Sequence, residues 1–464
     1  MSIFAKTNLI KMRRITTFII ALLLSVVAFA QSPEAVLESM GKNPTLSHAV
    51  AAPYPGAPAD KTADAPKGFK PFYFSLTGRH GSRYELKRNG FNSVCTILNK
   101  AHDMGILTKD GELFYDQAKR IAKAQEGHDG ELSSVGIEQW HNIAERAYKN
   151  FGKVFKSGSI EAKSSTSLRC VFSMVSFNNA IKGEVPSIKI SQYARMSELW
   201  IVRPLVDDPK YTDELKGIIK AHRDLTNWKG AQKSWEESTD LSSFLSKVST
   251  NPEALIKCCG DVPTFTFAKY SLTMLTFSEN IGFGRSELLS RLFTPEELYR
   301  IYISYEAKWV NGSIGRGHDA VEAHQSYMRP LVEDILNKAQ SAIDGKNPDV
   351  ANLRFTHDSY MGPLYSVMGY EGCVPQWNKN LELVATSYNH GTISPMASNL
   401  QIVLYRNKKG EVLVRSLINE RDAYLPIKCE TAPFYPWDEF CKYINDNLNA
   451  LDKARDRILN NVKK

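Results

Sequence analysis

The sequence predicts an α/β protein in which a helical insert interrupts the core. Strand-like segments stand near both ends of the chain, at residues 72–77 and 353–356 and as a pair at 400–405 and 412–417. Between them, residues 192–346 have helical character, with Trp, Lys and Glu mixed in. Strands at both ends and helices in the middle indicate one sheet whose connections include a long helical excursion.

The first thirty residues are typical of a secretory signal. Lys11, Arg13 and Arg14 precede an apolar run that ends in Ala28-Phe29-Ala30. This pattern predicts a signal peptide at 1–30, cleaved near Ala30, and export to the periplasm or the extracellular space. A membrane anchor is the alternative. The apolar stretch is short for a bilayer and no second one follows, so we expect no membrane span.

The charge of the mature chain favours small anionic ligands over nucleic acid. The signal carries four basic residues and no acidic one, so its removal reduces the formal charge of +8 by four, to +4. That excess is too mild to suggest nucleic acid, which needs a concentrated basic face. The seven cysteines leave at least one unpaired within a single chain. Neither their pairing nor the oligomeric state follows from the sequence. The adjacent Cys258 and Cys259 lack zinc-ligand spacing, so no metal site is predicted.

The first part of the chain, up to residue 164, is predicted to contain an arm, two strands and a helix. Residues 31–68 are predicted to be an arm or linker, since their Ala- and Pro-rich part has no hydrophobic period. The aromatic run 72–77 ends at a glycine, which predicts a buried strand and a turn. Apolar residues recur at helical spacing through 134–151, with Ser133 or Ser134 as the cap. A second strand is predicted at 160–164.

After residue 164 the chain is predicted to be mainly helical and then to return to strands. After the strand at 160–164, Ser165-Thr166 are expected to cap a helix that runs towards Ala180. Thr294 followed by proline and two glutamates is a strong helix start. The segments 400–405 and 412–417 flank Lys408-Lys409-Gly410 and predict a hairpin. The predicted divisions are two core parts, 69–191 and 347–464, around the insert, 192–346.

A cluster of chemically active residues follows the first strand, where open α/β sheets usually bind ligands. It reads Gly78-Arg79-His80-Gly81-Ser82-Arg83. Arg79 and Arg83 offer planar, permanently charged forks that match phosphate oxygens. His80 between them can attack phosphorus through a neutral ring nitrogen and hold the group covalently. Gly81 allows the backbone to approach the ligand closely.

These residues resemble the R-H-G-x-R signature of the histidine acid phosphatases. Further segments are similar to that family's elements in the same order: the segment that ends in Arg169, the His357-Asp358 pair after a late strand, and the closing hairpin through Glu420. The resemblance implies a histidine-phosphatase-like α/β core whose insert is a helical cap over the strand ends. It also implies that no metal or organic cofactor is needed.

The resemblance assigns a role to each residue. His80 would be the nucleophile, and Arg79, Arg83 and Arg169 would bind the phosphate. His357 would donate a hydrogen bond to a phosphate oxygen, and Asp358 would be the general acid that protonates the leaving alkoxide. A second pair, His318-Asp319, lies in the helical region without a preceding strand and is interpreted as a loop or helix cap.

The segment from Arg79 to Tyr84 resembles the multiple inositol polyphosphate phosphatases and phytase-like enzymes, in which an aromatic residue also follows the second arginine. Lys87 and Arg88 are candidates for extra phosphate contacts, with an ordinary solvated pair as the alternative. Glu85 stands where most relatives have proline. His357-Asp358-Ser359 differs from the His-Ala-Glu that is usual in the animal enzymes, so the donor is phytase-like. We therefore expect phosphate ester hydrolysis, with inositol polyphosphates such as phytate as substrates.

Three alternatives stay open. The same site would serve a broad-specificity or sugar-phosphate phosphatase. A catalytically inactive relative could keep the arginines to capture phosphate or glycan, although a binding protein needs neither His80 nor Asp358. A phosphotransferase or mutase would share the nucleophile. The predicted export disfavours this alternative, because the usual substrates of such enzymes are intracellular.

Overall fold

A computed structural model describes residues 32–58, 63–156 and 158–462. The predicted signal peptide, 1–30, lies outside the described residues. Within these ranges no helix combines the length and the apolar character that a membrane crossing requires.

One mixed sheet forms the centre of the core. Its strand order is β3-β2-β4-β1-β5-β6-β7, and β8 pairs with β6. The strands are β1 (Lys70–Arg79), β2 (Ser159–Ser164), β3 (Lys189–Tyr193), β4 (Asp349–Thr356), β5 (Asn399–Arg406), β6 (Val412–Ile418), β7 (Arg421–Ala423) and β8 (Phe434–Pro436). The strands from β3 to β1 are parallel, whereas β5 and β6 are antiparallel. The predicted strands and the hairpin are therefore confirmed.

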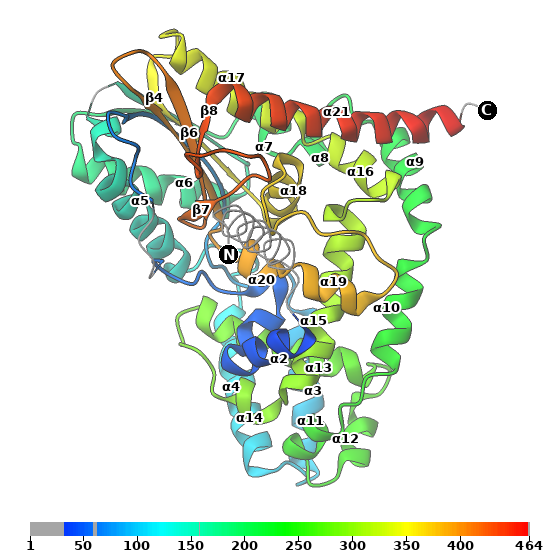
Figure 1. Cartoon of the computed structure of the whole chain (residues 1–464). Coiled ribbons are helices and arrows are strands. Elements are labelled where there is room, and N and C mark those ends of the chain that lie inside the picture. The colour runs from blue at the N-terminus through cyan, green and yellow to red at the C-terminus, as the bar shows by residue number, and fades with distance from the viewer. Residues whose placement is uncertain (1–31, 59–62, 157, 463–464) are drawn as a thin grey trace, which may run out of the picture.

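Helices cover both faces of this sheet (Figure 1). On one face lie α5 (Ser134–Phe155) and α6 (Leu168–Glu184), which share a hydrophobic cluster with Phe74 and Leu76 of β1. On the other face lie α17 (Arg329–Ile343), α18 (Asp358–Met368) and α21 (Trp437–Val462), in a cluster that includes Tyr73. Helix α16 (Asp319–Ser326) joins this cluster by packing against α18 and α21. Because successive strand residues point to opposite faces, β1 contributes to both clusters.

A third hydrophobic cluster holds the helical cap below the sheet in Figure 1. Its helices are α3 (Asn89–Asp103), α4 (Lys109–Gln125), α11 (Ser242–Val248), α12 (Pro252–Cys259), α13 (Thr264–Asn280), α14 (Leu288–Leu292) and α15 (Pro295–Trp309). The remaining helices are short or connect the two regions: α7 (Leu199–Val202), α8 (Pro204–Asp207), α9 (Asp213–Asp224), α10 (Trp228–Glu237), α19 (Leu381–Ser387) and α20 (His390–Ile393).

The predicted domain boundaries do not follow these clusters closely. The helices α3 and α4 lie in the predicted core part 69–191 but pack in the cap cluster. Helix α17 lies in the predicted insert, 192–346, but packs on β1 and β4, and α16, from the same insert, packs against α18 and α21 in the cluster that includes Tyr73. We propose that the cap is assembled from separate stretches of the chain. Amphipathic spacing alone does not reveal which surface a helix covers, so it does not locate the boundaries between core and cap.

Part of the predicted arm, 31–68, is helical. Helix α2 (Pro33–Lys42) begins at Ser32, whose hydroxyl accepts a hydrogen bond from the Ala35 amide. Val36 and Met40 lie one turn apart, are buried, and join the cap cluster. This segment therefore packs as part of the folded protein.

Two of the three helix caps predicted from Ser or Thr hydroxyls are confirmed. Ser133 caps α5, and Thr294 forms a reciprocal capping box with Glu297 at the start of α15. The predicted Ser165-Thr166 cap of α6 is wrong, because Ser167 occupies the cap position and makes no side-chain hydrogen bond there. The hydroxyl of Ser165 contacts His357 instead. Within the described residues all seven cysteines are free thiols.

Candidate active site

The register of the parallel strands brings the predicted motif residues together. Arg79 of β1 pairs with Thr356 of β4, so the next residues, His80 and His357, leave the sheet side by side. The His80 amide donates to the Thr356 carbonyl at 3.0 Å, and the two imidazole centroids lie 5.7 Å apart. The carboxyl ends of β1, β2 and β4 thus form one edge, as expected for a ligand site in such a sheet.

His80 is held as a neutral base. It is 2% exposed, and its Nδ1 lies 2.9 Å from the Gly81 carbonyl. Because a carbonyl only accepts, Nδ1 carries the proton and Nε2 keeps its lone pair. Burial, together with the charges of Arg79 and Arg83, holds the pKa of His80 well below its usual value. An unprotonated Nε2 is the form that a nucleophile requires.

The guanidinium of Arg79 is fixed by two backbone carbonyls. Its Nη1 donates to the Ser394 carbonyl at 2.8 Å and its Nη2 to the Val50 carbonyl at 2.5 Å. Arg79 is fully buried, and burial lowers its pKa to about 10, so it stays protonated at neutral pH. Its Nη2 also lies 3.8 Å from a carboxylate oxygen of Asp358.

The other two predicted arginines line the same site. Arg83 donates to the Tyr84 carbonyl, and its guanidinium lies 5.7 Å from the centre of the Phe277 ring in the cap. Arg169, near the start of α6, lies with its Nη2 3.3 Å from His357 Nδ1. The Nε atoms of Arg79, Arg83 and Arg169 are buried and have no hydrogen-bond partner among the described residues. Three cations with unused donors suit a multivalent anion.

Asp358 is the first residue of α18, and 24% of its side chain is exposed. Its Oδ1 accepts a hydrogen bond from the Ser359 amide. Burial alone would raise the pKa of this carboxyl, but Arg79 and Arg83 outweigh that effect and lower the pKa to about 2. The free protein therefore carries Asp358 as a carboxylate at any ordinary pH.

Both ring nitrogens of His357 are engaged. Nε2 lies 2.9 Å from Ser165 Oγ, and Nδ1 faces Arg169. Burial and then the charge of Arg169 lower the pKa of His357 to about 3, so the ring is neutral. The predicted hydrogen bond from His357 to a phosphate oxygen would need a change of these contacts.

The loop after the motif is tied down despite its lack of proline. Gln125 accepts a hydrogen bond from the Glu85 amide and donates to the Glu85 carbonyl, at 2.8 and 2.9 Å. The Glu85 carboxylate lies 3.8 Å from Arg83 Nη1, where it competes with any bound anion. Arg88 pairs with Asp129 at 3.3 Å, and Lys87 is exposed, so a role of either in phosphate binding stays a prediction.

Sequence reasoning missed residues that reach the site through tertiary contact. Val50 and Ser394 contribute backbone carbonyls, for which no motif exists. Arg203, between α7 and α8, is a further arginine: its charge helps to lower the pKa of His357, and it pairs with Asp207 at 3.0 Å. The preceding carbonyl, that of Val202, accepts a hydrogen bond from Thr356. A lone arginine among helical residues offered no signal.

The competing His318-Asp319 pair lies elsewhere. His318 caps α16 through its Nδ1, and Asp319 pairs with Arg457. Its interpretation as a helix cap is confirmed.

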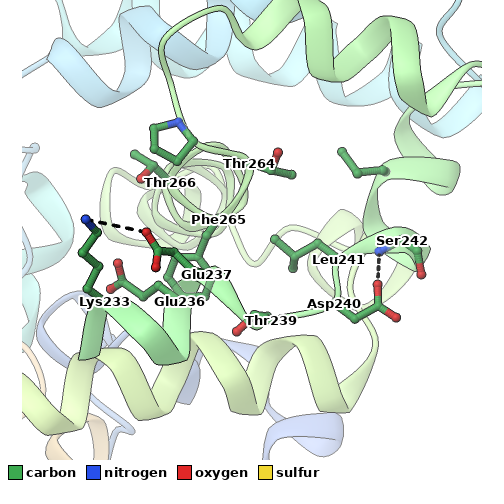
Figure 2. Close-up of a pocket in the computed structure, with 12 residues that line it drawn as sticks. Lys233, Glu236, Glu237, Thr239, Asp240, Leu241, Ser242, Thr264, Phe265 and Thr266 are labelled. Carbon is green, nitrogen blue, oxygen red and sulfur yellow. Dashed lines mark hydrogen bonds and ion pairs between the residues drawn. The ribbon is translucent and has the colours of Figure 1, made fainter. Parts of the chain in front are cut away.

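A cavity of about 590 Å³ lies in the cap, away from the motif residues (Figure 2). Its charged lining is mostly acidic, from Glu236, Glu237 and Asp240, with Lys233 as the basic member. Figure 2 shows Lys233 directed at Glu237, an ion pair of 3.7 Å. Such a lining repels phosphate esters, so the arginine-lined edge of the sheet is the better anion site. Among the described residues no cluster of three or more His, Cys, Asp or Glu could hold a metal ion.

Comparisons with known proteins identify the fold and the family. The family model described as histidine phosphatase superfamily (branch 2) matches residues 78–419. A multiple inositol polyphosphate phosphatase from Bifidobacterium longum, solved with inositol hexasulfate, is 17% identical and superimposes with a TM-score of 0.59 over 86% of this chain and 97% of that chain. A phytase from D. castellii is 16% identical, with a TM-score of 0.62 over 87% of this chain and 85% of that chain.

No curated protein matches the chain at a significant level. At these identities the solved structures establish the fold, and the family model extends from the strand before His80 to the closing hairpin. The chain therefore belongs to branch 2 of the histidine phosphatase superfamily.

Proposed function

We propose that the chain is an exported phosphatase that hydrolyses phosphate monoesters, inositol polyphosphates such as phytate above all, through a phosphohistidine at His80. The observation that carries the proposal is the buried, neutral His80 with its Nε2 lone pair free, between arginines whose Nε donors are unused. Two neighbours of known structure, a multiple inositol polyphosphate phosphatase and a phytase, support the substrate class.

The reaction proceeds in two displacements. Arg79, Arg83 and Arg169 bind the phosphate oxygens and offset their charge while Nε2 of His80 attacks phosphorus. The ester oxygen leaves and takes a proton from Asp358. A bound phosphate dianion offsets the arginine charges that lower the pKa of Asp358, so this pKa rises in the complex and the carboxyl can be protonated. Water then attacks the phosphohistidine and gives a proton to Asp358. This hydrolysis releases phosphate and restores His80.

The test is phosphate release from phytate, glucose 1-phosphate and p-nitrophenyl phosphate at pH 4 to 7, with EDTA present. We expect EDTA-resistant turnover, a preference for phytate, and its loss in His80→Ala. His141→Ala is the matched control, since His141 is an exposed histidine that pairs only with Glu145. A preference for glucose 1-phosphate would contradict inositol polyphosphates as the main substrates and would support a sugar-phosphate phosphatase instead. Phosphate binding without turnover of any ester would contradict the proposed enzymatic function.

A further inference from the structure

We propose that Ser165 is a positioning residue that fixes the tautomer of His357 and thereby holds Arg169 in place to bind phosphate. The inference rests on the proposed function only for its catalytic consequence. Ser165 follows β2 directly and is fully buried. Its amide donates to the Phe355 carbonyl of β4, which places its Oγ 2.9 Å from His357 Nε2.

The proton positions follow from the partners of the ring. A neutral imidazole has one donor nitrogen and one acceptor nitrogen. A guanidinium can only donate, so His357 Nδ1, which lies 3.3 Å from Arg169 Nη2, must be the acceptor. Nε2 therefore carries the proton and donates it to Ser165 Oγ. The ring is neutral at the pH values of interest, because burial lowers its pKa to about 3.

The hydroxyl of Ser165 is itself held in this acceptor role. Its Oγ also accepts a hydrogen bond from the Ser167 amide at 3.4 Å, at the foot of α6. The Sγ of the neighbouring Cys170 lies 3.7 Å from each ring nitrogen of His357. The Cys170 thiol in turn donates to the Thr356 carbonyl at 3.2 Å. The turn between β2 and α6 thus presents an acceptor, rather than a donor, to His357.

The tautomer matters because Arg169 depends on it. With the proton on Nδ1 instead, two N–H groups would face each other and the guanidinium would be pushed away from the ring. The Arg169 guanidinium contacts His357 through Nη2, and its Nε has no hydrogen-bond partner among the described residues. Its guanidinium is therefore poised by His357, and with the alternative tautomer the site would lose one of its three ordered cations.

The experiment compares Ser165→Ala with two other variants. Ser165→Thr keeps the hydroxyl. Ser164→Ala is the matched control, since it removes a buried hydroxyl one residue away that donates to the Ser165 carbonyl. Three quantities are measured: the tautomer of His357 by NMR with ¹⁵N-labelled histidine, the affinity for inorganic phosphate, and kcat and KM for p-nitrophenyl phosphate against pH.

The wild type and the Thr and Ser164→Ala variants are expected to show the Nε2–H tautomer. Ser165→Ala should lose it and bind phosphate roughly tenfold more weakly, because an ordered charge-assisted contact is lost. An Nδ1–H tautomer in the wild type, or an unchanged tautomer and phosphate affinity in Ser165→Ala, would overturn the proposal. Equal loss in the Ala and Thr variants would assign the effect to packing and overturn it too. An inert wild type would contradict the proposed function, while the tautomer and phosphate affinity would still decide this inference.

Discussion

At the scale of single residues, the surroundings of His80 and Asp358 set the protonation state of each. His80 and Asp358 lie near the same arginines, and those cations lower the pKa of both. For His80 this yields directly the unprotonated form that the proposed nucleophile needs. For Asp358 it yields the wrong form for a general acid until an anion binds. In the proposed mechanism, substrate binding is therefore coupled to the protonation of Asp358, the group that completes the first step.

Replacement of Asp358 by Asn should slow the turnover of each substrate in proportion to the basicity of its leaving group. An inositol alkoxide needs a proton as it departs, whereas p-nitrophenolate is stable without one. We expect kcat for phytate to fall by about 10² to 10⁴-fold and kcat for p-nitrophenyl phosphate to fall far less. Steady-state rates on both esters measure the ratio. An equal loss on the two substrates would remove the proton-donor role from Asp358.

At the scale of elements, the site depends on close approach between the first loop and α5. A Cβ on Gly81 would lie 2.5 Å from the Gly136 carbonyl oxygen and 2.7 Å from the Gly136 Cα. The second residue belongs to the first turn of α5, so neither neighbour can move alone. The glycine that the motif suggested for approach to a ligand is thus required for approach to a helix.

Gly81→Ala should therefore displace either α5 or His80. We expect a loss of about 1 to 3 kcal/mol in unfolding free energy, typical of overpacking, together with a large loss of turnover. Gly183→Ala is the control: it lies in α6, and an added Cβ meets nothing within 4 Å. That change should be neutral or stabilise by about 0.5–1 kcal/mol, the helix preference for Ala. Urea unfolding of both variants checks the difference, and equal effects would refute the steric account.

What the sequence predicted and missed follows from the range of the interactions. The strand before His80, the capping box at Thr294 and the hairpin between β5 and β6 arise from local patterns, and the structure has them. Ser165 was interpreted locally as a helix cap, but its hydroxyl serves His357, which is 192 residues away in the chain. The carbonyls that hold Arg79 have no side-chain signature. Contacts of this kind depend on the tertiary fold and leave no local pattern.

At the scale of the whole molecule, the N-terminal segment joins the cap to the core. His48 Nδ1 accepts from the Ala51 amide, and its Nε2 lies 2.8 Å from Thr273 Oγ1 in α13. Two residues on, the Val50 carbonyl reaches Arg79 at the sheet. Arg79, next to His80, is therefore oriented in part by a segment that is fastened to the cap.

Buried neutral histidines should limit the stability of the whole protein at low pH. His48 is 3% exposed, and burial lowers its pKa to about 3, whereas an imidazole in the unfolded chain titrates near 6.5. Below about pH 6.5 the unfolded state takes up a proton that the folded state refuses. The free energy of unfolding then falls by about 1.4 kcal/mol per pH unit for each such group, down to about pH 3. His390 is fully buried, with its pKa also lowered to about 3, and adds to the same slope.

His48→Asn keeps an acceptor for the Ala51 amide and removes the titrating group. Whatever its stability at pH 7, it should lose about 1.4 kcal/mol less per pH unit than the wild type between pH 6 and pH 4.5. Urea unfolding at several pH values gives both slopes. Parallel slopes would show that His48 does not stay neutral in the folded protein.

The position of β1 also governs how the chain can fold. Its two neighbours in the sheet, β4 and β5, begin at residues 349 and 399, whereas β1 ends at Arg79. During synthesis the strand that precedes His80 therefore emerges long before either partner exists, and its unpaired backbone and aromatic side chains wait for most of the chain to follow. Contacts this distant in sequence slow folding and expose aggregation-prone intermediates. The central strand of a nascent chain therefore stays unpaired until the last third of the sequence is made, and a fragment that stops before residue 349 has no partner for it.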